Sequence, residues 1–224
     1  MDKAVNRTFK AIINKEITGI FGDYDVDGAT STAILGNYFN EINHEIQIYI
    51  PDRKTEGYGP SINGFKKLIS KGAKLIFTVD CGTLSFETID FFKKKNTDVL
   101  VFDHHQSELK LPNAVSIVNP NRFDDESKLN YLCAAGVCLM FLIALNKKLR
   151  ESKWFDNNNI KEPNLINYLD LVSLGTVCDV VPLIGLNRAI VSQGLEVFKK
   201  KSNLGLNTLK NICGIETNIT TYHL

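Results

Sequence analysis

The chain has 224 residues and a formal net charge of +1, so it lacks the excess of basic residues that marks many nucleic-acid-binding proteins. Its longest apolar stretch, residues 131–145, is shorter than the roughly 20 residues that cross a bilayer, and its first residues hold no apolar signal segment. The five cysteines form no C-x-x-C pair. We therefore expect a cytoplasmic protein with free thiols and no membrane partner.

Apolar runs alternate with helix-forming stretches along the chain, which is typical of an α/β fold. Strands are expected at residues 18–23, 46–51, 75–80, 99–103 and 115–119. Helices are expected at residues 29–41, 61–70, 85–95, 134–148, 165–174 and 188–199, with a surface loop at 153–163. This order predicts a mainly parallel sheet covered by helices on both faces, in one domain spanning residues 1–224.

The most informative tract is residues 22–28, GDYDVDG, which places Asp23, Asp25 and Asp27 at alternate positions between an apolar run and a helix-forming one. On an extended backbone, side chains at alternate positions point the same way, so this turn can direct three carboxylates at one spot near a helix N-terminus. Three close carboxylates repel one another unless a cation lies between them. The tract therefore predicts a metal site, and a solvated acidic turn is the simpler alternative.

Further polar residues follow other apolar segments. Asp80 follows the run 74–79, and Asp179 follows the run 171–178. The triplet Asp103, His104 and His105 ends the run 99–102. Ligands in open parallel sheets gather beyond the carboxyl ends of the strands. Carboxylates and imidazole arriving there from separate segments form a mixed oxygen and nitrogen ligand set, which suits Mn²⁺ or Mg²⁺ better than a metal that prefers thiolates.

Two other kinds of metal site fit the sequence less well. The DxDxDG pattern also opens the calcium loop of an EF-hand, but the twelfth position counted from Asp23 is Ile34 rather than the Glu that such a loop needs. The flanking segments are also a strand and a helix rather than two helices. A zinc site using Cys81 and Cys178 beside two carboxylates is the less favoured alternative to Mn²⁺.

A series of motifs, in order and spread over nearly the whole chain, resembles the DHH phosphoesterase superfamily and, within it, the RecJ-like single-strand-specific exonucleases. The matching segments are residues 22–31 (GDYDVDGATS), 51–53 (PDR), 56–59 (EGYG), 78–82 (TVDCG), 103–105 (DHH), 119–120 (NP), 133–137 (CAAGV) and 174–183 (LGTVCDVVPL). The resemblance implies a metal-dependent phosphodiester hydrolase that degrades single-stranded DNA from 5′ to 3′, in DNA repair and recombination.

The resemblance also implies two divalent ions, usually Mn²⁺, that hold the scissile phosphate between them. The implied ligands are Asp23 and Asp25 for one ion, Asp27, His104 and Asp179 for the other, and Asp80 bridging both. Carboxylates offset the charge of the ions, and a neutral imidazole favours Mn²⁺ over Mg²⁺, which is the alternative cation.

Other residues are expected to act beside the metal ligands. Adjacent side chains on a strand point apart, so His105 is not expected to reach the ion that His104 binds. By resemblance, His105 binds the phosphate or assists the leaving group, a structural histidine being the alternative, and Asp103 orients an imidazole in support of catalysis. Arg53 is expected to clamp a phosphate, because guanidinium binds phosphate bidentately. His44 has no ligand-like neighbours and is expected at the surface.

The main departure from the family is the extent of the chain. The family carries a second, substrate-binding domain that residues 1–224 lack, so single-stranded DNA and a separate chain supplying that domain are the expected partners. Three hypotheses stand: a RecJ-like exonuclease domain, a phosphodiesterase of short oligonucleotides or cyclic dinucleotides, and a remnant that binds metal without turnover. The DYDVD tract argues against the second, because those relatives usually carry a histidine upstream of the Asp pair.

Overall fold

A parallel sheet forms the centre of the protein, whose computed structural model describes residues 1–200, 203–216 and 218–224. In this part of the chain the sheet has five strands in the order β2-β1-β3-β4-β5, and every neighbouring pair is parallel. The strands are β1 (Thr18–Gly22), β2 (Ile46–Tyr49), β3 (Leu75–Val79), β4 (Asp98–Phe102) and β5 (Ser116–Val118). The predicted strands and the parallel α/β architecture are confirmed.

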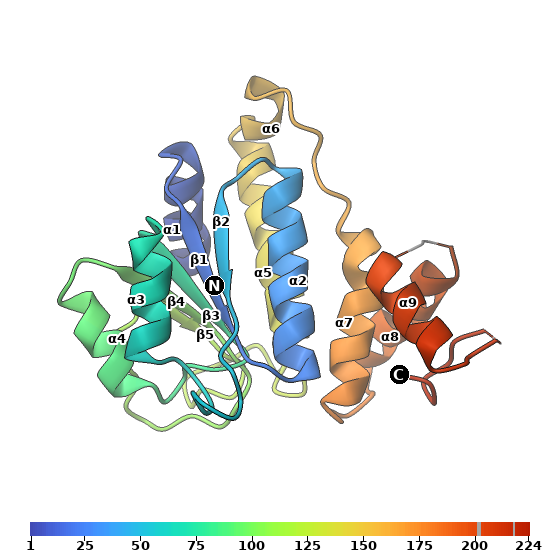
Figure 1. Cartoon of the computed structure of the whole chain (residues 1–224). Coiled ribbons are helices and arrows are strands. Elements are labelled where there is room, and N and C mark those ends of the chain that lie inside the picture. The colour runs from blue at the N-terminus through green and yellow to red at the C-terminus, as the bar shows by residue number, and fades with distance from the viewer. Residues whose placement is uncertain (201–202, 217) are drawn as a thin grey trace.

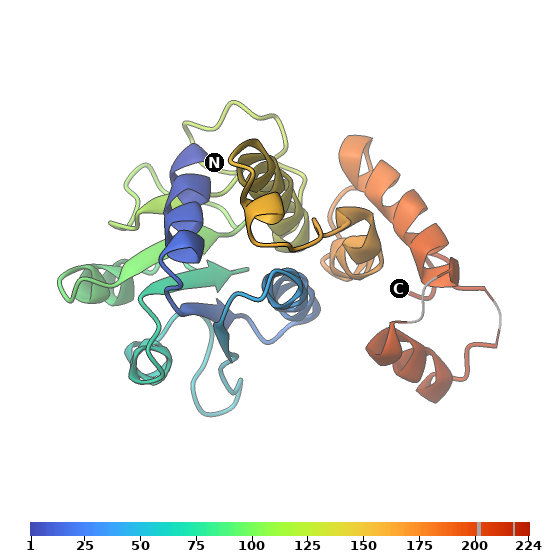
Figure 2. The ribbon, with the colours of Figure 1, turned by 90° about the horizontal axis from the view of Figure 1, so that it is seen from above.

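Helices cover both faces of the sheet, as Figures 1 and 2 show from two directions. On one face lie α1 (Asp2–Ile13), α2 (Val26–Glu41) and α5 (Ala134–Glu151). On the other lie α3 (Ile62–Ser70) and α4 (Phe86–Lys93). Because both faces are covered, the central strands carry almost only apolar residues, which is what parallel sheets require.

Alternate residues of each strand enter different cores. Phe77 and Phe102 point toward α5, where their rings lie 5.9 and 4.5 Å from that of Phe141. Phe21 points to the opposite face, with its ring 5.7 Å from that of Phe65 on α3. This two-sided packing fixes the register of the strands, because a shift by one residue would exchange the two faces.

The C-terminal helices form a further layer beyond α2 and α5, on the side away from the sheet (Figure 1). They are the 3₁₀ helix η1 (Leu165–Tyr168), α7 (Leu169–Cys178), α8 (Gly185–Lys200) and α9 (Leu204–Ile212). α7 packs against α2 at Gly175, where a Cβ atom would lie 2.5 Å from Oγ1 of Thr30 and 2.9 Å from Oδ1 of Asp27. The glycine therefore permits the close approach that brings the end of α7 to the start of α2.

Helix α2 begins at Val26, three residues before the predicted start. Asp25 is its N-cap, and the Asp25 carboxylate accepts a hydrogen bond of 2.9 Å from the amide of Gly28. Asp27 consequently lies in the first helical turn rather than on extended backbone. The expectation of an extended backbone was therefore wrong for Asp27, which falls in a different group of possible ligands from Asp23 and Asp25.

Other elements differ from expectation in the described parts of the chain. The sequence patterns predict no helix over α1, yet its buried residues recur at helical spacing: Ala4, Val5, Thr8, Ala11 and Ile12. The expected loop at 153–163 contains the short helix α6 (Trp154–Asn157). The helix expected at 165–174 starts as η1 and continues as α7 to Cys178. Within the described residues, no helix has both the length and the apolar character needed to cross a bilayer.

His44 is buried rather than at the surface, which corrects the expectation for this residue. Its ring is 7% exposed, and its Nε2 atom lies 2.9 Å from the hydroxyl of Thr18 at the amino end of β1. Burial lowers the pKa of His44 to about 4, because the charged imidazolium is poorly solvated there. The side chain is therefore a neutral hydrogen-bonding group of the core at neutral pH.

Candidate metal centre

Three of the expected site residues stand directly after strands, at the carboxyl ends of β1, β3 and β4. Each amide still donates to the neighbouring strand: Asp23 to Val79 at 3.2 Å, Asp80 to Phe102 at 2.9 Å, and Asp103 to Val118 at 3.1 Å. The hydrogen-bond ladder therefore extends one residue beyond each strand. It fixes the backbone from which these carboxylates project, at the edge where α/β proteins bind ligands.

The backbone is strained at or beside two of these ligand-type residues. Asp80 has φ of +61°, a left-handed conformation that is unfavourable for a residue with a side chain. Val180, with φ of +58°, follows directly after Asp179 at the end of α7, and a β-branched residue is rare in this region. Such strain persists only where the surrounding structure enforces it, and it is concentrated at functional sites in proteins.

Asp27 is held by the N-terminus of α5. Its Oδ2 atom accepts a hydrogen bond of 2.6 Å from the amide of Ala134, and its Oδ1 atom accepts one of 2.9 Å from the amide of Ala135. The carboxylate thus satisfies two amides of the first turn and lies beside the positive end of the helix dipole. The motif CAAGV at 133–137 contributes to the site by orienting Asp27.

Possible metal ligands gather in three overlapping groups, and within each group one ligand atom per residue lies within 4.8 Å of the others. The groups are Asp23 with Asp25 and Asp80, Asp27 with His104 and Asp179, and Asp80 with His104 and His105. The Nε2 atom of His104 lies 3.3 Å from Asp80, 3.5 Å from Asp179 and 3.7 Å from Asp27. Asp80 joins the first group to the histidines. Among the described residues, none of these groups contains a cysteine.

The electrostatics of these carboxylates disfavour their charged forms without a cation. Burial, followed by repulsion from Asp27 and Asp25, raises the pKa of Asp80 to about 10. Burial also raises the pKa values of Asp23, Asp27 and Asp179 above the ordinary range. Clustered acidic groups with this behaviour are expected where a positively charged ligand binds.

The unpaired atoms of the site fit a divalent cation. Among the described residues, several buried side-chain atoms here have no hydrogen-bond partner: Asp23 Oδ1, both carboxylate oxygens of Asp80, His104 Nε2 and Asp179 Oδ2. A buried polar atom without a partner is costly, so native proteins rarely leave one unexplained. Carboxylate oxygens with one or two imidazole nitrogens are the donors that Mn²⁺ accepts. The residues present therefore fit the two-cation site expected from the sequence.

Asp103 fixes the backbone of the two histidines and the ring of His105 by hydrogen bonds. Its Oδ1 atom accepts hydrogen bonds from the amides of His104 and His105, at 2.8 and 3.2 Å, and lies 2.8 Å from Nδ1 of His105. Its Oδ2 atom accepts one of 2.9 Å from the amide of Thr83. Burial alone raises the pKa of Asp103, but the hydrogen bonds from His105 and Thr83 outweigh it and hold the pKa below the usual range. The imidazole that Asp103 contacts is His105.

Tyr58 belongs to the site, although its place in the EGYG segment did not indicate a role for it. Its hydroxyl donates to the backbone oxygen of Asp80 at 3.2 Å and lies 3.4 Å from Nδ1 of His105. Its ring meets that of His105 edge-on, with centroids 5.9 Å apart. The segment EGYG was the available signal, but the contact joins residues 47 positions apart.

Asn119 and Asn121, which follow β5, fix the loop that carries the histidines. Asn119 is 2% exposed, and its amide donates at 2.9 Å both to the backbone oxygen of His105 and to the hydroxyl of Thr83. Asn121 donates to the backbone oxygen of His104. The sequence alone assigns no role to the NP motif at 119–120, and these contacts show which parts of the site it connects.

Arg53 lies at the margin of the site rather than among the ligand groups. It is exposed, and its guanidinium carbon is 5.4 Å from the centre of the Tyr24 ring. Tyr24 stands between Asp23 and Asp25 in the chain, so this contact joins Arg53 to the segment that carries the first ligand group. The predicted site residues are thus collected at one edge of the sheet, with Arg53 at its rim.

Comparisons with known proteins agree with this geometry. Residues 18–176 match the model of the DHH family, N-terminal domain. The single-stranded-DNA-specific exonuclease RecJ of Dickeya dadantii (strain 3937) is 40% identical over 212 residues, which cover 94% of this chain and 37% of that protein. The chain thus spans little more than a third of the length of this curated relative.

Solved structures give the same result. The crystal structure of exonuclease RecJ bound to manganese matches with a TM-score of 0.81 and 30% identity, over 96% of this chain and 52% of that one. The crystal structure of RecJ in complex with Mn²⁺ from Thermus thermophilus matches with a TM-score of 0.75 and 28% identity, over 95% of this chain and 29% of that one. From the family match over most of its length and the ligand groups at its sheet edge, this chain belongs to the DHH family.

Proposed function

We propose that this chain is the catalytic part of a RecJ-type 5′-to-3′ exonuclease of single-stranded DNA, active in DNA repair and recombination. The observation that carries the proposal is the set of overlapping ligand groups that share Asp80 and His104. Both carboxylate oxygens of Asp80 and the Nε2 atom of His104 are buried and have no hydrogen-bond partner among the described residues. The relatives named above support the choice of single-stranded DNA over other phosphodiesters.

Two divalent cations, Mn²⁺ or alternatively Mg²⁺, complete the proposed site. Asp23 and Asp25 would hold one cation, Asp27, His104 and Asp179 would hold the other, and Asp80, which joins the ligand groups, would serve both. When bound, two such cations draw electron density from the phosphate and make the attacking water more acidic. The chain supplies the positions, because its ligands come from strand ends and helix ends that pack together. Structures of RecJ with Mn²⁺ and with Mg²⁺ support both ions as candidates.

In this proposal His105 acts on the phosphate, and Asp103 holds the His105 ring in position. The contact between Asp103 and Nδ1 of His105 raises the pKa of His105 and keeps a proton on that nitrogen. The Nε2 atom of His105 then faces the substrate, where it binds a phosphate oxygen or gives a proton to the leaving oxygen. Arg53 supplies a guanidinium group at the margin of the site for a neighbouring phosphate.

The relatives extend far beyond the matched region, so we propose single-stranded DNA and a further substrate-binding segment as partners. That segment belongs either to a longer form of this protein or to a separate chain. The five cysteines are all free, which supports the cytoplasm as the proposed location because its thiols stay reduced.

The test is a cleavage assay with Mn²⁺ on a 5′-labelled single strand, with a duplex and a cyclic dinucleotide as control substrates. We expect release of labelled nucleotide from the single strand and little from either control. Faster cleavage of the cyclic dinucleotide would favour the small-substrate alternative. Two bound Mn²⁺ ions by calorimetry, without cleavage of any substrate, would favour a metal-binding protein without catalysis.

The two histidines give a second test of the assigned roles. His104→Ala should weaken Mn²⁺ binding, because His104 belongs to both histidine-containing ligand groups. His105→Ala should leave Mn²⁺ bound and lower kcat, because its ring is held by Asp103. An equal loss of Mn²⁺ in both variants, measured by calorimetry, would show that His105 is also a ligand.

A further inference from the structure

The turn of residues 52–56, which carries Arg53, is closed by its own end residues. The Oδ1 atom of Asp52 accepts hydrogen bonds from the amides of Lys54 and Thr55, at 2.8 and 3.0 Å. Glu56 closes the turn in both directions, because its amide donates to the backbone oxygen of Asp52 at 2.9 Å and its Oε1 atom accepts from the amide of Asp52 at 3.1 Å. The turn is therefore a compact unit although it is exposed.

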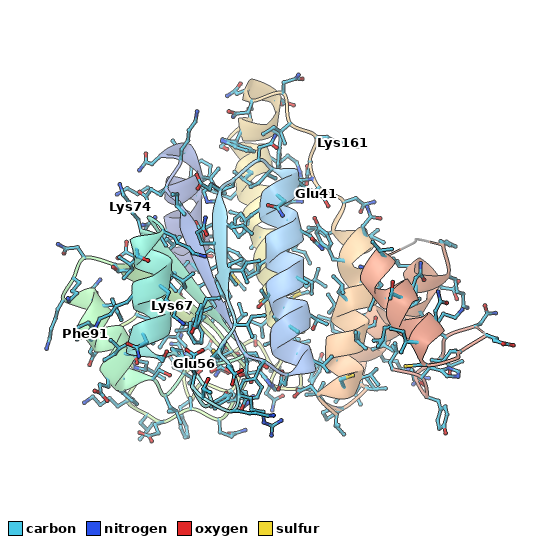
Figure 3. The ribbon with its side chains drawn as sticks, viewed as in Figure 1. Glu41, Glu56, Lys67, Lys74, Phe91 and Lys161 are labelled. Atoms are coloured by element: carbon cyan, nitrogen blue, oxygen red, sulfur yellow. The ribbon has the colours of Figure 1, made fainter. Side chains whose placement is uncertain are left out.

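Glu56 also ties this turn to the sheet and to α3. Its Oε2 atom accepts a hydrogen bond from the hydroxyl of Tyr49, the last residue of β2. The ammonium of Lys67, on α3, donates to the same hydroxyl at 2.9 Å and lies 4.7 Å from the ring centre. Figure 3 shows Lys67 on α3 and Glu56 on the loop below it. The Lys67 ammonium polarises the Tyr49 hydroxyl, so that this hydroxyl is a stronger donor to the Glu56 carboxylate. Hydrogen bonds that involve a charged partner are shorter and stronger than neutral ones.

The Tyr49 ring is itself held in place. It lies 5.5 Å from the ring of Phe21 on β1. Helix α3 approaches both rings at Gly64, where a Cβ atom would lie 2.5 Å from Cε2 of Phe21 and 2.7 Å from Cε1 of Tyr49. The hydroxyl that Glu56 accepts therefore projects from a ring packed between a strand and a helix, which gives the exposed turn a rigid anchor.

Arg53 links the turn to the segment that carries the first ligand group. Arg53 lies over the ring of Tyr24, which stands between the ligand-type residues Asp23 and Asp25. A long arginine side chain on a mobile loop would lose much conformational freedom on binding a phosphate. A turn fixed by Glu56 on one side and Tyr24 on the other removes part of that loss in advance.

We propose that Glu56 and Tyr49 are positioning residues that hold the 52–56 turn so that Arg53 is preorganised for a substrate phosphate. The inference rests on the proposed function, because it assigns the phosphate contact of Arg53 to that same site. Glu56 and Tyr49 act through Arg53 and touch neither the substrate nor the cations. The EGYG motif thereby gains a role for its first residue.

The first experiment measures binding without turnover. A short single strand with a 3′ fluorescein label is titrated with the protein in EDTA, and fluorescence anisotropy gives Kd. Glu56→Ala and Tyr49→Phe should each raise Kd about tenfold, the effect of losing one well-placed charge-assisted hydrogen bond. Glu56→Gln, which keeps an acceptor oxygen, should restore part of the affinity. The matched control is Glu162→Ala, which removes a half-buried glutamate paired with the exposed Arg150, away from the site.

A double-mutant cycle separates positioning from a general structural effect. Arg53→Ala alone should weaken binding at least as much as Glu56→Ala, and adding Glu56→Ala to Arg53→Ala should change Kd no further. The proposal would be overturned if the fold changes in Kd of the two single variants multiplied in the double variant. Unchanged binding by Glu56→Ala would overturn it as well. Loss of Mn²⁺-dependent cleavage at saturating strand, with Kd unchanged, would also contradict it, because positioning acts on binding.

A third readout does not depend on nuclease function. Trypsin cleaves after Arg53 and Lys54, so its rate at this turn reports how firmly the turn is held. Glu56→Ala and Tyr49→Phe should be cut there faster than the wild type and Glu162→Ala, at unchanged Tm. If wild-type protein cleaves no strand but the tryptic difference is present, the proposed function fails while the anchoring of the turn stands. Equal tryptic rates in all variants would overturn the anchoring itself.

Discussion

Buried polar groups at the two ends of the central sheet differ in how well they are paired by hydrogen bonds. At the carboxyl ends, described atoms of Asp23, Asp80 and His104 have no hydrogen-bond partner, and Asp80 has left-handed backbone. At the amino ends, polar side chains pair with one another, although the Nη1 atom of Arg7 also lacks a partner among the described residues. Thr18 contacts His44 at 2.9 Å, and Arg7 bonds to Glu16 and Asp98 at 2.6 Å each.

This difference separates binding from stability within one fold. Unpaired carboxylates and strain at the carboxyl ends destabilise the metal-free protein but are ready for a cation. Paired groups at the amino ends contribute to the free energy of unfolding and offer little to a ligand. Substitutions at the two ends should therefore change different quantities, activity and metal binding in one case and stability in the other.

The largest expected effect is that of Asp80→Asn. Loss of a group that joins two ligand clusters should lower Mn²⁺-dependent cleavage by more than about 100-fold, beyond the roughly 10- to 100-fold typical of residues that only support ligands. Because a pKa of about 10 leaves Asp80 uncharged at neutral pH without metal, the neutral asparagine should leave the metal-free Tm unchanged. Mn²⁺ should raise the Tm of the wild type, by a free energy of about 2.7 kcal/mol at about 100 times Kd, and that of the variant much less.

The control for this prediction is the metal-free protein. Circular dichroism in EDTA should show equal cooperative unfolding for both proteins. A large drop in the metal-free Tm of Asp80→Asn would mean that Asp80 stabilises the fold. That result would contradict the assignment of the carboxyl ends to metal binding rather than to stability.

The next effect is a pH dependence at the amino end. The pKa of His44 is about 4 in the folded protein and about 6.5 when unfolded, so the unfolded state binds more protons between these values. Its contribution to stability is complete above about pH 6.5 and is lost as the pH falls through about 4, by about 3 kcal/mol in total. Carboxylates with raised pKa values, such as Asp80, contribute with the opposite sign.

The measurement is therefore a difference between two proteins. Urea unfolding of wild type and His44→Gln at several pH values should give a free-energy gap that narrows from pH 7 to pH 4. Glutamine keeps a polar group near Thr18 but does not titrate. A gap independent of pH would show that the pKa of His44 is the same in the folded and unfolded states, against the lowered value.

A smaller loss of stability is expected from Asn146→Ala. The Asn146 side chain accepts a hydrogen bond of 2.6 Å from the hydroxyl of Tyr38 and donates one of 3.1 Å to the backbone oxygen of Pro163. Tyr38 is fully buried, so its hydroxyl would lose its partner without gaining water, which costs about 1–3 kcal/mol. Guanidinium unfolding measures this, and Tyr38→Phe in the Asn146→Ala background should recover part of the loss.

The smallest effect is expected for Glu162→Gln. Glu162 pairs with Arg150 at 2.7 Å, but the arginine is largely in solvent, where screening leaves little net stabilisation. We expect no measurable change in Tm or in cleavage. A clear fall in Tm would show that this pair, and not only the buried groups, stabilises the amino end.

The sequence by itself determined the strand positions and the chemical types in the site. Apolar runs that end in Asp23, Asp80 and Asp103 are local patterns, and the carboxyl ends of parallel strands share one edge, so their convergence could be inferred. Such features depend on short windows of sequence and on one topological rule. The family resemblance, rather than a local pattern, implied that His104 is a ligand and that His105 acts on the phosphate.

Only the tertiary structure decided how these groups are supported, and it gives the physical cause of the grouping that the resemblance implied. Asp27 joins Asp179 and His104 because α2 starts early and because the N-terminus of α5, 107 residues further along the chain, holds its carboxylate. The burial of His44 and the contact of Tyr58 with His105 also depend on distant segments. Local patterns do not encode such pairings, because the hydrogen bonds and burial that create them exist only after the helices have packed on the sheet.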